Sequence, residues 1–378
     1  MKMRKFGKLG IECSAFGLGC MRFTSKEVNG ETVVDEEKAI DIIRTAIDGG
    51  TTYMDTAYVY LGGKSEVVLG KALQDGYRDK VTIATKLPID QVKVYEDIDR
   101  ILNESLDCLQ TDHLDFWLMH GINKERWEYA KKMGVPQRFD ELKAEGRIRY
   151  KCFSFHGPYD EFEYILKDYD WDMVQIQYNF MDVENQAGTK GLELAGAMGI
   201  PVVIMEGLLG GRLSKAPDNV QAVYDSFPVK RSPVEWSFRW LLNHPEVSTV
   251  LSGCTEVEQV VDNLRIFDSL EAGQMTEDEL KLMDDVRAAY QSRTRVGCTG
   301  CSYCMPCPGG LEIPRIFAAW NESTLYNTAP KDNWGLQQII REGHGPENCL
   351  QCGSCEAACP QSLPIIELMK EAVVELEQ

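Results

Sequence analysis

The sequence predicts an α/β protein in which a barrel of eight parallel strands alternating with helices precedes a small, mostly helical domain. Short apolar runs alternate with longer amphipathic stretches eight times over about the first 270 residues. Ionisable residues stand at the ends of three successive strands, where barrel enzymes place their catalytic groups. Eight of the 13 cysteines fall between residues 298 and 359, which sets this region apart from the rest.

The expected strands are short runs rich in β-branched and aromatic residues. They lie at residues 16–21, 51–54, 81–86, 114–119, 148–154, 173–177, 202–205 and 247–252. The intervening helices, recognised by apolar residues at helical spacing, lie at 35–48, 65–73, 95–109, from after 120 to about 144, 159–167, 189–198, 233–243 and 256–267. Eight such pairs fit the ~250 residues of a TIM barrel. A doubly wound open sheet fits less well, because no Gly-x-Gly-x-x-Gly turn follows the first strand.

A further helix is expected at 276–290, and residues 292–297 then resemble a linker. We therefore predict two domains, a barrel at 1–291 and a cysteine-rich domain at 292–378. Within the second domain, helices are expected at 313–320, 334–341 and 365–376.

Composition limits the possible partners. The formal net charge is −19, which argues against binding to nucleic acid or to anionic membranes. No apolar run approaches the ~20 residues of a membrane span, and the N-terminus lacks the apolar run of a signal peptide. A cytoplasmic protein is expected, and its cysteines are then not a disulfide framework.

Four residues form the candidate catalytic group. Asp55 ends the second expected strand, Tyr60 follows a short loop later, Lys86 ends the third strand and His120 follows the fourth. Taken singly, each has a plainer interpretation as a helix cap, a solvated lysine or a buried histidine. Taken together, they suggest a phenol made more acidic by a nearby lysine, because a positive charge lowers the pKa of tyrosine.

This arrangement resembles the aldo/keto reductase family. The resemblance rests on Asp-Thr-Ala-x-x-Tyr from Asp55 to Tyr60, on the Gly-x-Ser-Glu that follows, and on the lysine and histidine at successive strand ends. It implies that Tyr60 is the general acid, that Asp55 holds Lys86, and that His120 orients a carbonyl oxygen. It also implies a nicotinamide cofactor and a small carbonyl substrate.

The resemblance extends to the cofactor site. The positions that match the family's cofactor contacts are Ser154, Gln175, Gly207, Leu208, Gly210, Gly211 and Asn263. Three departures stand beside them. Phe155 replaces the family's asparagine, Met205-Glu206 replaces an aromatic residue, and no cation follows the eighth strand to meet a 2′-phosphate. The choice between NADH and NADPH therefore stays open.

The cysteines form two motifs. The second, at Cys349, Cys352, Cys355 and Cys359-Pro360, is the bacterial ferredoxin pattern, and the first, at Cys298, Cys301, Cys304 and Cys307, is one residue shorter before its last cysteine. We expect two 4Fe–4S clusters in a ferredoxin-like domain, one on Cys298, Cys301 and Cys304 with Cys359, the other on Cys349, Cys352 and Cys355 with Cys307. Zinc, or one cluster beside a degenerate site, are the alternatives.

The sequence thus predicts an oxidoreductase of the aldo/keto reductase type, with clusters that relay electrons to or from a ferredoxin or flavoprotein. Two other functions stay open. One is an electron-transfer protein whose barrel is a non-catalytic scaffold, and the other is a carbonyl reductase whose clusters are structural. Hydride carries two electrons and a cluster moves one, and no flavin-binding motif is apparent.

Overall fold

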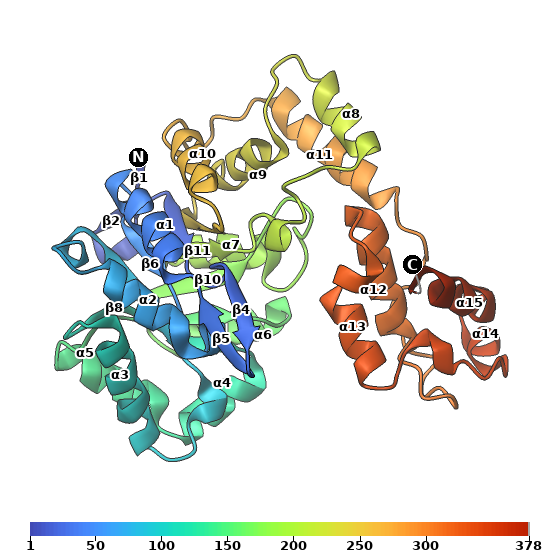
Figure 1. Ribbon diagram of the computed structural model, residues 1–378, viewed down its shortest axis with the longest axis horizontal. Helices are drawn as coiled ribbons and strands as arrows, with labels where there is room; N and C mark the ends of the chain where they lie inside the picture. The colour runs from blue at the N-terminus through green and yellow to red at the C-terminus, as the bar shows by residue number, and fades with distance from the viewer. Residues whose placement is uncertain (377–378) are drawn as a thin grey trace. The chain divides into compact units, whose positions relative to one another are not determined.

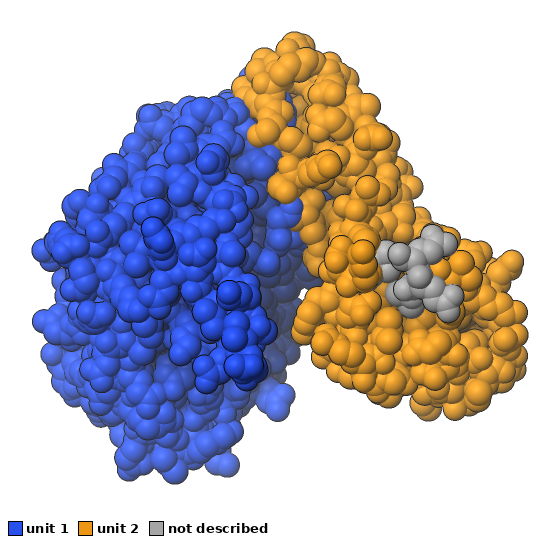
Figure 2. All heavy atoms as spheres, viewed as in Figure 1, with its two compact units in different colours: residues 1–211, 234–276 blue, residues 212–233, 277–378 orange. Residues whose placement is uncertain are grey.

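The computed structural model describes residues 1–376 and divides them into two compact units. The first unit comprises residues 1–211 and 234–276, and the second comprises residues 212–233 and 277 onward, as the two colours of Figure 2 show. Residues 212–233, which interrupt the first unit in sequence, thus pack with the cysteine-rich end of the chain.

The first unit is a closed barrel of eight parallel strands in the order β3-β6-β7-β8-β9-β10-β11-β12, with β12 pairing back to β3 (Figure 1). The strands are β3 Phe16–Gly19, β6 Tyr53–Asp55, β7 Thr82–Leu87, β8 Leu114–Ile122, β9 Ile148–Phe155, β10 Met173–Gln177, β11 Val202–Met205 and β12 Val247–Gly253. All eight expected strands are present, and the predicted TIM barrel is confirmed. Their carboxyl ends meet at one face.

Helices surround this barrel. They are α1 Glu36–Asp48, α2 Lys64–Ala72, α3 Glu96–Leu109, α4 Lys124–Lys132, α5 Val135–Ala144, α6 Tyr159–Asp168, α7 Gly188–Ala197, α9 Pro233–Leu242 and α10 Val257–Phe267. The single helix expected after His120 is two helices. Gly134 breaks it with a φ of +77°, a conformation that side chains disfavour, and Pro136 then lies in the first turn of α5.

Two hairpins join the barrel unit. The first pairs β1 (Met3–Lys5) with β2 (Glu12–Ser14), and the second pairs β4 (Ser25–Val28) with β5 (Glu31–Val34). The second was not predicted from the sequence. Phe6, which follows β1, is fully buried, and its ring centroid lies 5.6 Å from that of Phe116. The first hairpin therefore contributes to the barrel core.

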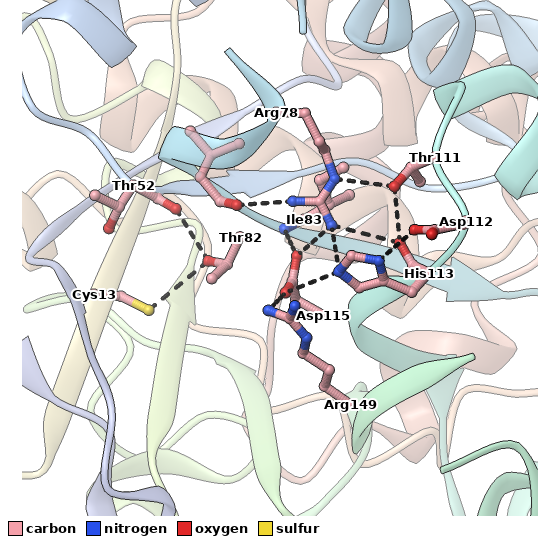
Figure 3. A network of polar contacts seen from close by, with 11 residues as sticks. Cys13, Thr52, Arg78, Thr82, Ile83, Thr111, Asp112, His113, Asp115 and Arg149 are labelled. Carbon is pink, nitrogen blue, oxygen red and sulfur yellow. Dashed lines mark hydrogen bonds and ion pairs between the residues drawn. The ribbon is translucent and has the colours of Figure 1, made fainter. Parts of the chain in front are cut away.

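A buried charge cluster lies at the amino-terminal ends of the strands, opposite the face where their carboxyl ends meet (Figure 3). The Asp115 carboxylate, fully buried, accepts hydrogen bonds from Arg78 (2.9 Å), from Arg149 (2.7 Å) and from the backbone N–H of Ile83 (2.9 Å). Residues at this face of a barrel serve stability rather than catalysis. We therefore look for the active site at the other face.

The second unit is helical. Its helices are α8 Asp218–Ser226, α11 Glu277–Gln291, α12 Ile313–Tyr326, α13 Trp334–Arg341, α14 Ser354–Ala358 and α15 Ile365–Leu376. Phe317 and Trp320 of α12, Ile339 of α13 and Met369 of α15 share one buried core. Within residues 1–376, no helix is both long enough and apolar enough to cross a membrane.

Candidate active site

A buried ion pair lies at the carboxyl end of the barrel strands. Lys86 Nζ donates to both carboxylate oxygens of Asp55, at 2.8 Å each, and to the backbone oxygen of Thr56 at 2.6 Å. Asp55 ends β6 and Lys86 lies near the end of the neighbouring β7, so parallel pairing brings the two together. Three acceptors satisfy the three N–H groups of the ammonium and fix its position.

Tyr60 and His120 lie beside this pair. Lys86 Nζ is 4.8 Å from the centroid of the Tyr60 ring, and the Tyr60 and His120 rings meet edge to face with centroids 5.7 Å apart. The structure thus brings all four predicted catalytic residues into one group. Asp55, Tyr60 and His120 line a common cavity, while Lys86, 1% exposed, is buried behind them.

The pKa of Tyr60 is shifted upward, whereas the sequence alone suggested a downward shift. Burial raises the pKa of Tyr60, the charge of Lys86 lowers it, and the net direction is upward. Lys86 therefore acts in the expected sense, but burial outweighs it. A phenol with a raised pKa holds its proton at neutral pH, as a proton donor requires.

His120 is neutral at physiological pH. Burial, followed by the positive charge of Lys86, lowers its pKa to about 3. Asp55 and Lys86 show opposing influences. Burial raises the pKa of Asp55 although Lys86 opposes it, and the pKa of Lys86 is raised because Asp55 and Tyr60 outweigh the burial that lowers it.

The cavity at this face, about 330 Å³, is open to solvent and falls within the size range of small-molecule sites. Five of the seven predicted cofactor residues line it, namely Gln175, Gly207, Leu208, Gly210 and Gly211. Gln175 lies in β10, and the other four residues lie in the loop after β11. Residues that are separated in sequence therefore share one wall of the cavity.

Two features of this wall suit a nicotinamide nucleotide. The Oε1 atom of Gln175 is buried and has no hydrogen-bond partner among residues 1–376, so it can accept an N–H from a carboxamide. Gly210 has a φ of +67°, and a side chain there would be strained. The glycine loop therefore leaves its backbone open to a close-lying group such as a pyrophosphate.

Ser154 and Asn263 do not line the cavity. The Oγ atom of Ser154 accepts a hydrogen bond from the backbone of Gly121 at 2.8 Å, and Asn263 Nδ2 donates to Ser252 Oγ at 3.2 Å. Phe155, which replaces the family's asparagine, packs against Phe162 of α6 with ring centroids 5.1 Å apart. These positions support neighbouring backbone and core instead of facing the space.

Three further ionisable residues, to which the sequence analysis gave no role in the site, also line the cavity: Arg22, His156 and Glu206. Arg22 follows β3, and its side chain lies against Gly253 and Gly210. Glu206 follows β11 with a φ of +58°. His156 and Glu206 directly follow barrel strands and Arg22 follows β3 after Cys20 and Met21; this position was the available signal, because the loops after barrel strands form the mouth.

The cysteines of the second unit also gather. Cys298, Cys301, Cys304 and Cys359 line one small cavity, walled by apolar residues such as Phe317 and Ile365. They come from both motifs and form the first expected ligand set. Burial raises the pKa of Cys355, and Cys307 is close enough to raise it further, which brings together members of the second set.

A single ion does not fit this arrangement as well as a larger group. In the described part of the chain, no three His, Cys, Asp or Glu side chains are close enough together to hold one metal ion. Four sulfurs around one zinc ion would lie about 3.8 Å apart, as its bond lengths and tetrahedral geometry require. Thiols spread around an apolar-walled cavity suit a multi-iron cluster instead.

Comparison with known proteins agrees with this geometry. Residues 15–288 match the model of the aldo/keto reductase family, which spans well over half of the chain. The chain belongs to the aldo/keto reductase family. Residues 297–363 match a second model, described as a 4Fe-4S dicluster domain, so an iron–sulfur domain follows the reductase barrel.

Individual relatives support the assignment. The uncharacterised oxidoreductase YqkF of Bacillus subtilis is 27% identical over 329 residues, covering 77% of this chain and all of that protein. Aldo-keto reductase YhdN of the same organism is 38% identical over 185 residues, 43% of this chain and 55% of that protein. The holo form of aldo-keto reductase AKR11C1 from Bacillus halodurans aligns at 27% identity with a TM-score of 0.64, over 76% and 96% of the two chains.

This aldo/keto reductase is therefore an NAD(P)H-dependent oxidoreductase that carries an iron–sulfur domain. The relative YqkF is covered in full by 77% of this chain, and the region that matches the dicluster model lies beyond the reductase match. A Klebsiella pneumoniae aldo-keto reductase solved with NADPH shares the fold at 24% identity and a TM-score of 0.59, over 76% and 95% of the two chains.

Proposed function

We propose that the barrel reduces a small carbonyl compound, and oxidises the corresponding alcohol, with Tyr60, Lys86, Asp55 and His120 as the catalytic group. One observation carries the proposal. Tyr60 and His120 face one cavity that Asp55 also lines, and Lys86 is buried behind it in an ion pair with Asp55. Their rings are close enough for one carbonyl oxygen to contact both the phenol and the imidazole.

Each residue then has a distinct task. A nicotinamide supplies or accepts the hydride when it is bound. Tyr60 holds a proton at neutral pH and donates it to the carbonyl oxygen as negative charge develops there. His120, neutral because of its lowered pKa, donates a hydrogen bond to the same oxygen without adding a full charge. Lys86 keeps the phenol oxygen near a positive charge, and Asp55 holds Lys86 in place.

The nicotinamide would lie along the wall formed by Gln175 and the glycine loop. Gln175 would accept from its carboxamide, and Gly207, Leu208, Gly210 and Gly211 would approach its pyrophosphate. Arg22 supplies the cation that was missing after β12, because its side chain lies against Gly253. A phosphate bound there would meet a guanidinium, which favours NADPH over NADH.

Hydride transfer is tested with deuterated cofactor. Protein purified without oxygen is incubated with NADPH or NADH deuterated at C4 and with a panel of small aldehydes and ketones. The proposal expects deuterium on the carbinol carbon of the product, with one deuterium per cofactor oxidised. Cofactor oxidation without deuterium in any alcohol product would overturn it in favour of a barrel that does not reduce carbonyls.

For the second unit, we propose a domain at residues 292–378 that holds two 4Fe–4S clusters with exchanged fourth ligands. The first set is Cys298, Cys301, Cys304 and Cys359, and the second is Cys349, Cys352, Cys355 and Cys307. The support is that the first set lines one cavity although Cys359 lies in the other motif. Two such clusters contain about eight iron atoms per chain.

The clusters exchange single electrons with a redox partner in this proposal. A ferredoxin or a flavoprotein fits as this partner, because a ferredoxin carries single electrons and a reduced flavin can give up its two electrons one at a time. A structural role for the clusters is the competing proposal. Because free thiols and clusters of this kind persist in reducing compartments, we expect the protein in the cytoplasm.

Anaerobic iron counting and EPR test the cluster proposal. We expect about eight irons per chain and an EPR signal from two interacting clusters after reduction with dithionite. About four irons and one isolated signal would reject two clusters. If protein that lacks iron reduces the carbonyl substrate as fast as protein with intact clusters, the clusters have no part in the carbonyl reaction.

A further inference from the structure

A chain of side chains leads away from the active-site cavity at His156. His156 Nδ1 lies 3.1 Å from Gln186 Oε1, Gln186 Nε2 lies 2.5 Å from Gln177 Oε1, and Gln177 Nε2 lies 2.8 Å from Asp182 Oδ2. Asp182 is itself held by Asn179, whose Oδ1 accepts from the backbone N–H of Asp182 at 3.0 Å. The four residues of this relay, His156, Gln186, Gln177 and Asp182, come from the ends of β9 and β10 and the loop that follows β10.

The end of the relay fixes its direction. An ionised carboxylate only accepts hydrogen bonds, so Gln177 must present its NH₂ group to Asp182 and its oxygen to Gln186. Gln186 must then donate with its NH₂ group and accept with its oxygen. The ring nitrogen that faces this oxygen, Nδ1 of His156, must carry the hydrogen. Each orientation follows from the one before it.

The direction of the relay also determines whether the other ring nitrogen of His156, Nε2, donates or accepts. In the neutral ring, a hydrogen on Nδ1 leaves Nε2 as a bare acceptor. Among the described residues, Nε2 of His156 has no hydrogen-bond partner, and the ring lines the cavity shared with Tyr60 and His120.

We propose that His156 is a substrate-binding residue that accepts a hydrogen bond from a hydroxyl next to the reacting carbonyl, with the relay to Asp182 holding it in this form. The proposal rests on the carbonyl reduction proposed above and names its substrate class. A carbonyl oxygen held by Tyr60 and His120 leaves its substituents toward neighbouring walls, one of which carries His156. Hydroxyketones and hydroxyaldehydes supply the required donor.

The relay explains why three residues that do not line the cavity are polar. Gln177 is 6% exposed, and a buried amide is stable only when its hydrogen bonds are made. Gln177, Gln186 and Asp182 are therefore positioning residues, because they act on substrate only through His156. Because His156 is exposed to solvent, an analogue that lacks the hydroxyl loses this hydrogen bond while water can pair with Nε2, so the discrimination is that of one hydrogen bond.

A matched pair of ketones tests the proposal. Hydroxyacetone and butanone differ by a hydroxyl in place of a methyl group, and the ratio of their kcat/KM values is measured with NADPH in the full-length holoenzyme. The intrinsic reactivities of the two ketones do not depend on which protein variant is used. A change in the ratio between the parent protein and a variant therefore reports on binding of the hydroxyl. We expect His156→Phe to lower the ratio by about tenfold, the effect of one well-formed hydrogen bond.

A second variant leaves the cavity untouched. In Asp182→Asn the relay loses its obligate acceptor, so its direction is no longer fixed, and we expect the ratio to fall by about threefold. Glu184→Gln removes an exposed carboxylate two residues away and should leave the ratio unchanged. If His156→Phe does not fold, the Asp182→Asn ratio decides.

Two outcomes would overturn the proposal. An unchanged ratio in His156→Phe, or in Asp182→Asn where that variant decides, means that no hydroxyl is recognised there. A raised KM for NADPH with an unchanged ketone ratio means that His156 accepts from the cofactor carboxamide instead. Both outcomes are distinct from failure of the proposed function, in which neither ketone is reduced by the parent protein.

Discussion

Lys86 and Asp55 form a contact at 2.8 Å in which the lysine side chain is 1% exposed and the aspartate side chain 4%. Removing two opposite charges from water costs several kcal/mol per ion, so such a pair is weak evidence for stability. Its location behind Tyr60 gives a different reason for its presence. A positive charge is held at a fixed distance from the phenol, and it is held there before any ligand binds.

The pair should show strong coupling in unfolding. Lys86→Met leaves Asp55 buried and unpaired, and we expect a loss of about 3–5 kcal/mol. The double variant Lys86→Met/Asp55→Asn removes both charges and should be more stable than Lys86→Met alone. Denaturant unfolding of the parent protein, Lys86→Met, Asp55→Asn and the double variant measures the coupling free energy between the two residues. Additive effects would mean that the two charges are not paired in solution.

Tyr60 should be essential for turnover. Because general acid catalysis contributes about 10²–10⁴-fold, Tyr60→Phe should lower kcat by at least about 10². Tyr58 is a matched control, since its hydroxyl donates to Glu104 and does not line the cavity. Tyr58→Phe should keep near-parent turnover. Equal losses in the two variants would point to a general disturbance of the loop.

The raised pKa of Tyr60 predicts opposite pH profiles for the two directions of reaction. Reduction needs the protonated phenol, so its rate should stay level from neutral pH up to alkaline pH and decline only as Tyr60 ionises. Alcohol oxidation needs the phenolate, so its rate should rise with pH over the same range. Steady-state kinetics in both directions measure this. A reduction rate that falls from pH 7 to 9 would contradict the assignment.

The lowered pKa of His120 predicts a contribution to acid sensitivity. The unfolded chain binds a proton at His120 near pH 6.5, whereas the folded chain does so only near pH 3. Between these values the unfolded state binds more protons than the folded state does, so acid favours unfolding. The contribution of His120 to the free energy of unfolding is therefore complete above about pH 6.5 and is lost as pH falls toward 3. His120→Gln should flatten the decline in Tm over this window.

The cysteine assignment predicts that residues from different motifs behave alike. Cys298→Ser and Cys359→Ser should each remove the same cluster, with iron falling from about eight to about four per chain and the same EPR signal disappearing. Cys108→Ser is a control, because Cys108 belongs to neither motif. Loss of different EPR signals in the two variants would show that each motif binds its own cluster.

Arg22 should govern the choice of nicotinamide. If its guanidinium meets the extra phosphate, Arg22→Met should raise KM for NADPH by about tenfold or more and change KM for NADH little, since one charge-assisted hydrogen bond contributes about 1.5–3 kcal/mol. Equal increases for both cofactors would place Arg22 at the shared pyrophosphate. Unchanged values would remove it from cofactor binding.

Local pattern was sufficient for much of the fold. Each barrel strand is an apolar run bounded by polar or glycine residues, and burial on both faces makes such runs recognisable. The four candidate catalytic residues were found because each stands at or just beyond a strand end. The breaks around Gly134 and the second hairpin were missed, since the apolar spacing of α4 and α5 continues across the break and β4 is exposed throughout.

The sequence by itself determined the barrel, and it singled out the four candidate catalytic residues and the eight candidate cluster cysteines, because these depend on periodicity and spacing along the chain. Tertiary structure alone decided the balance between burial and charge at Tyr60, the placement of Arg22 against Gly253, and the relay from His156 to Asp182. The physical reason is that solvation and hydrogen-bond direction depend on neighbours in space, and these neighbours come from strands far apart in sequence.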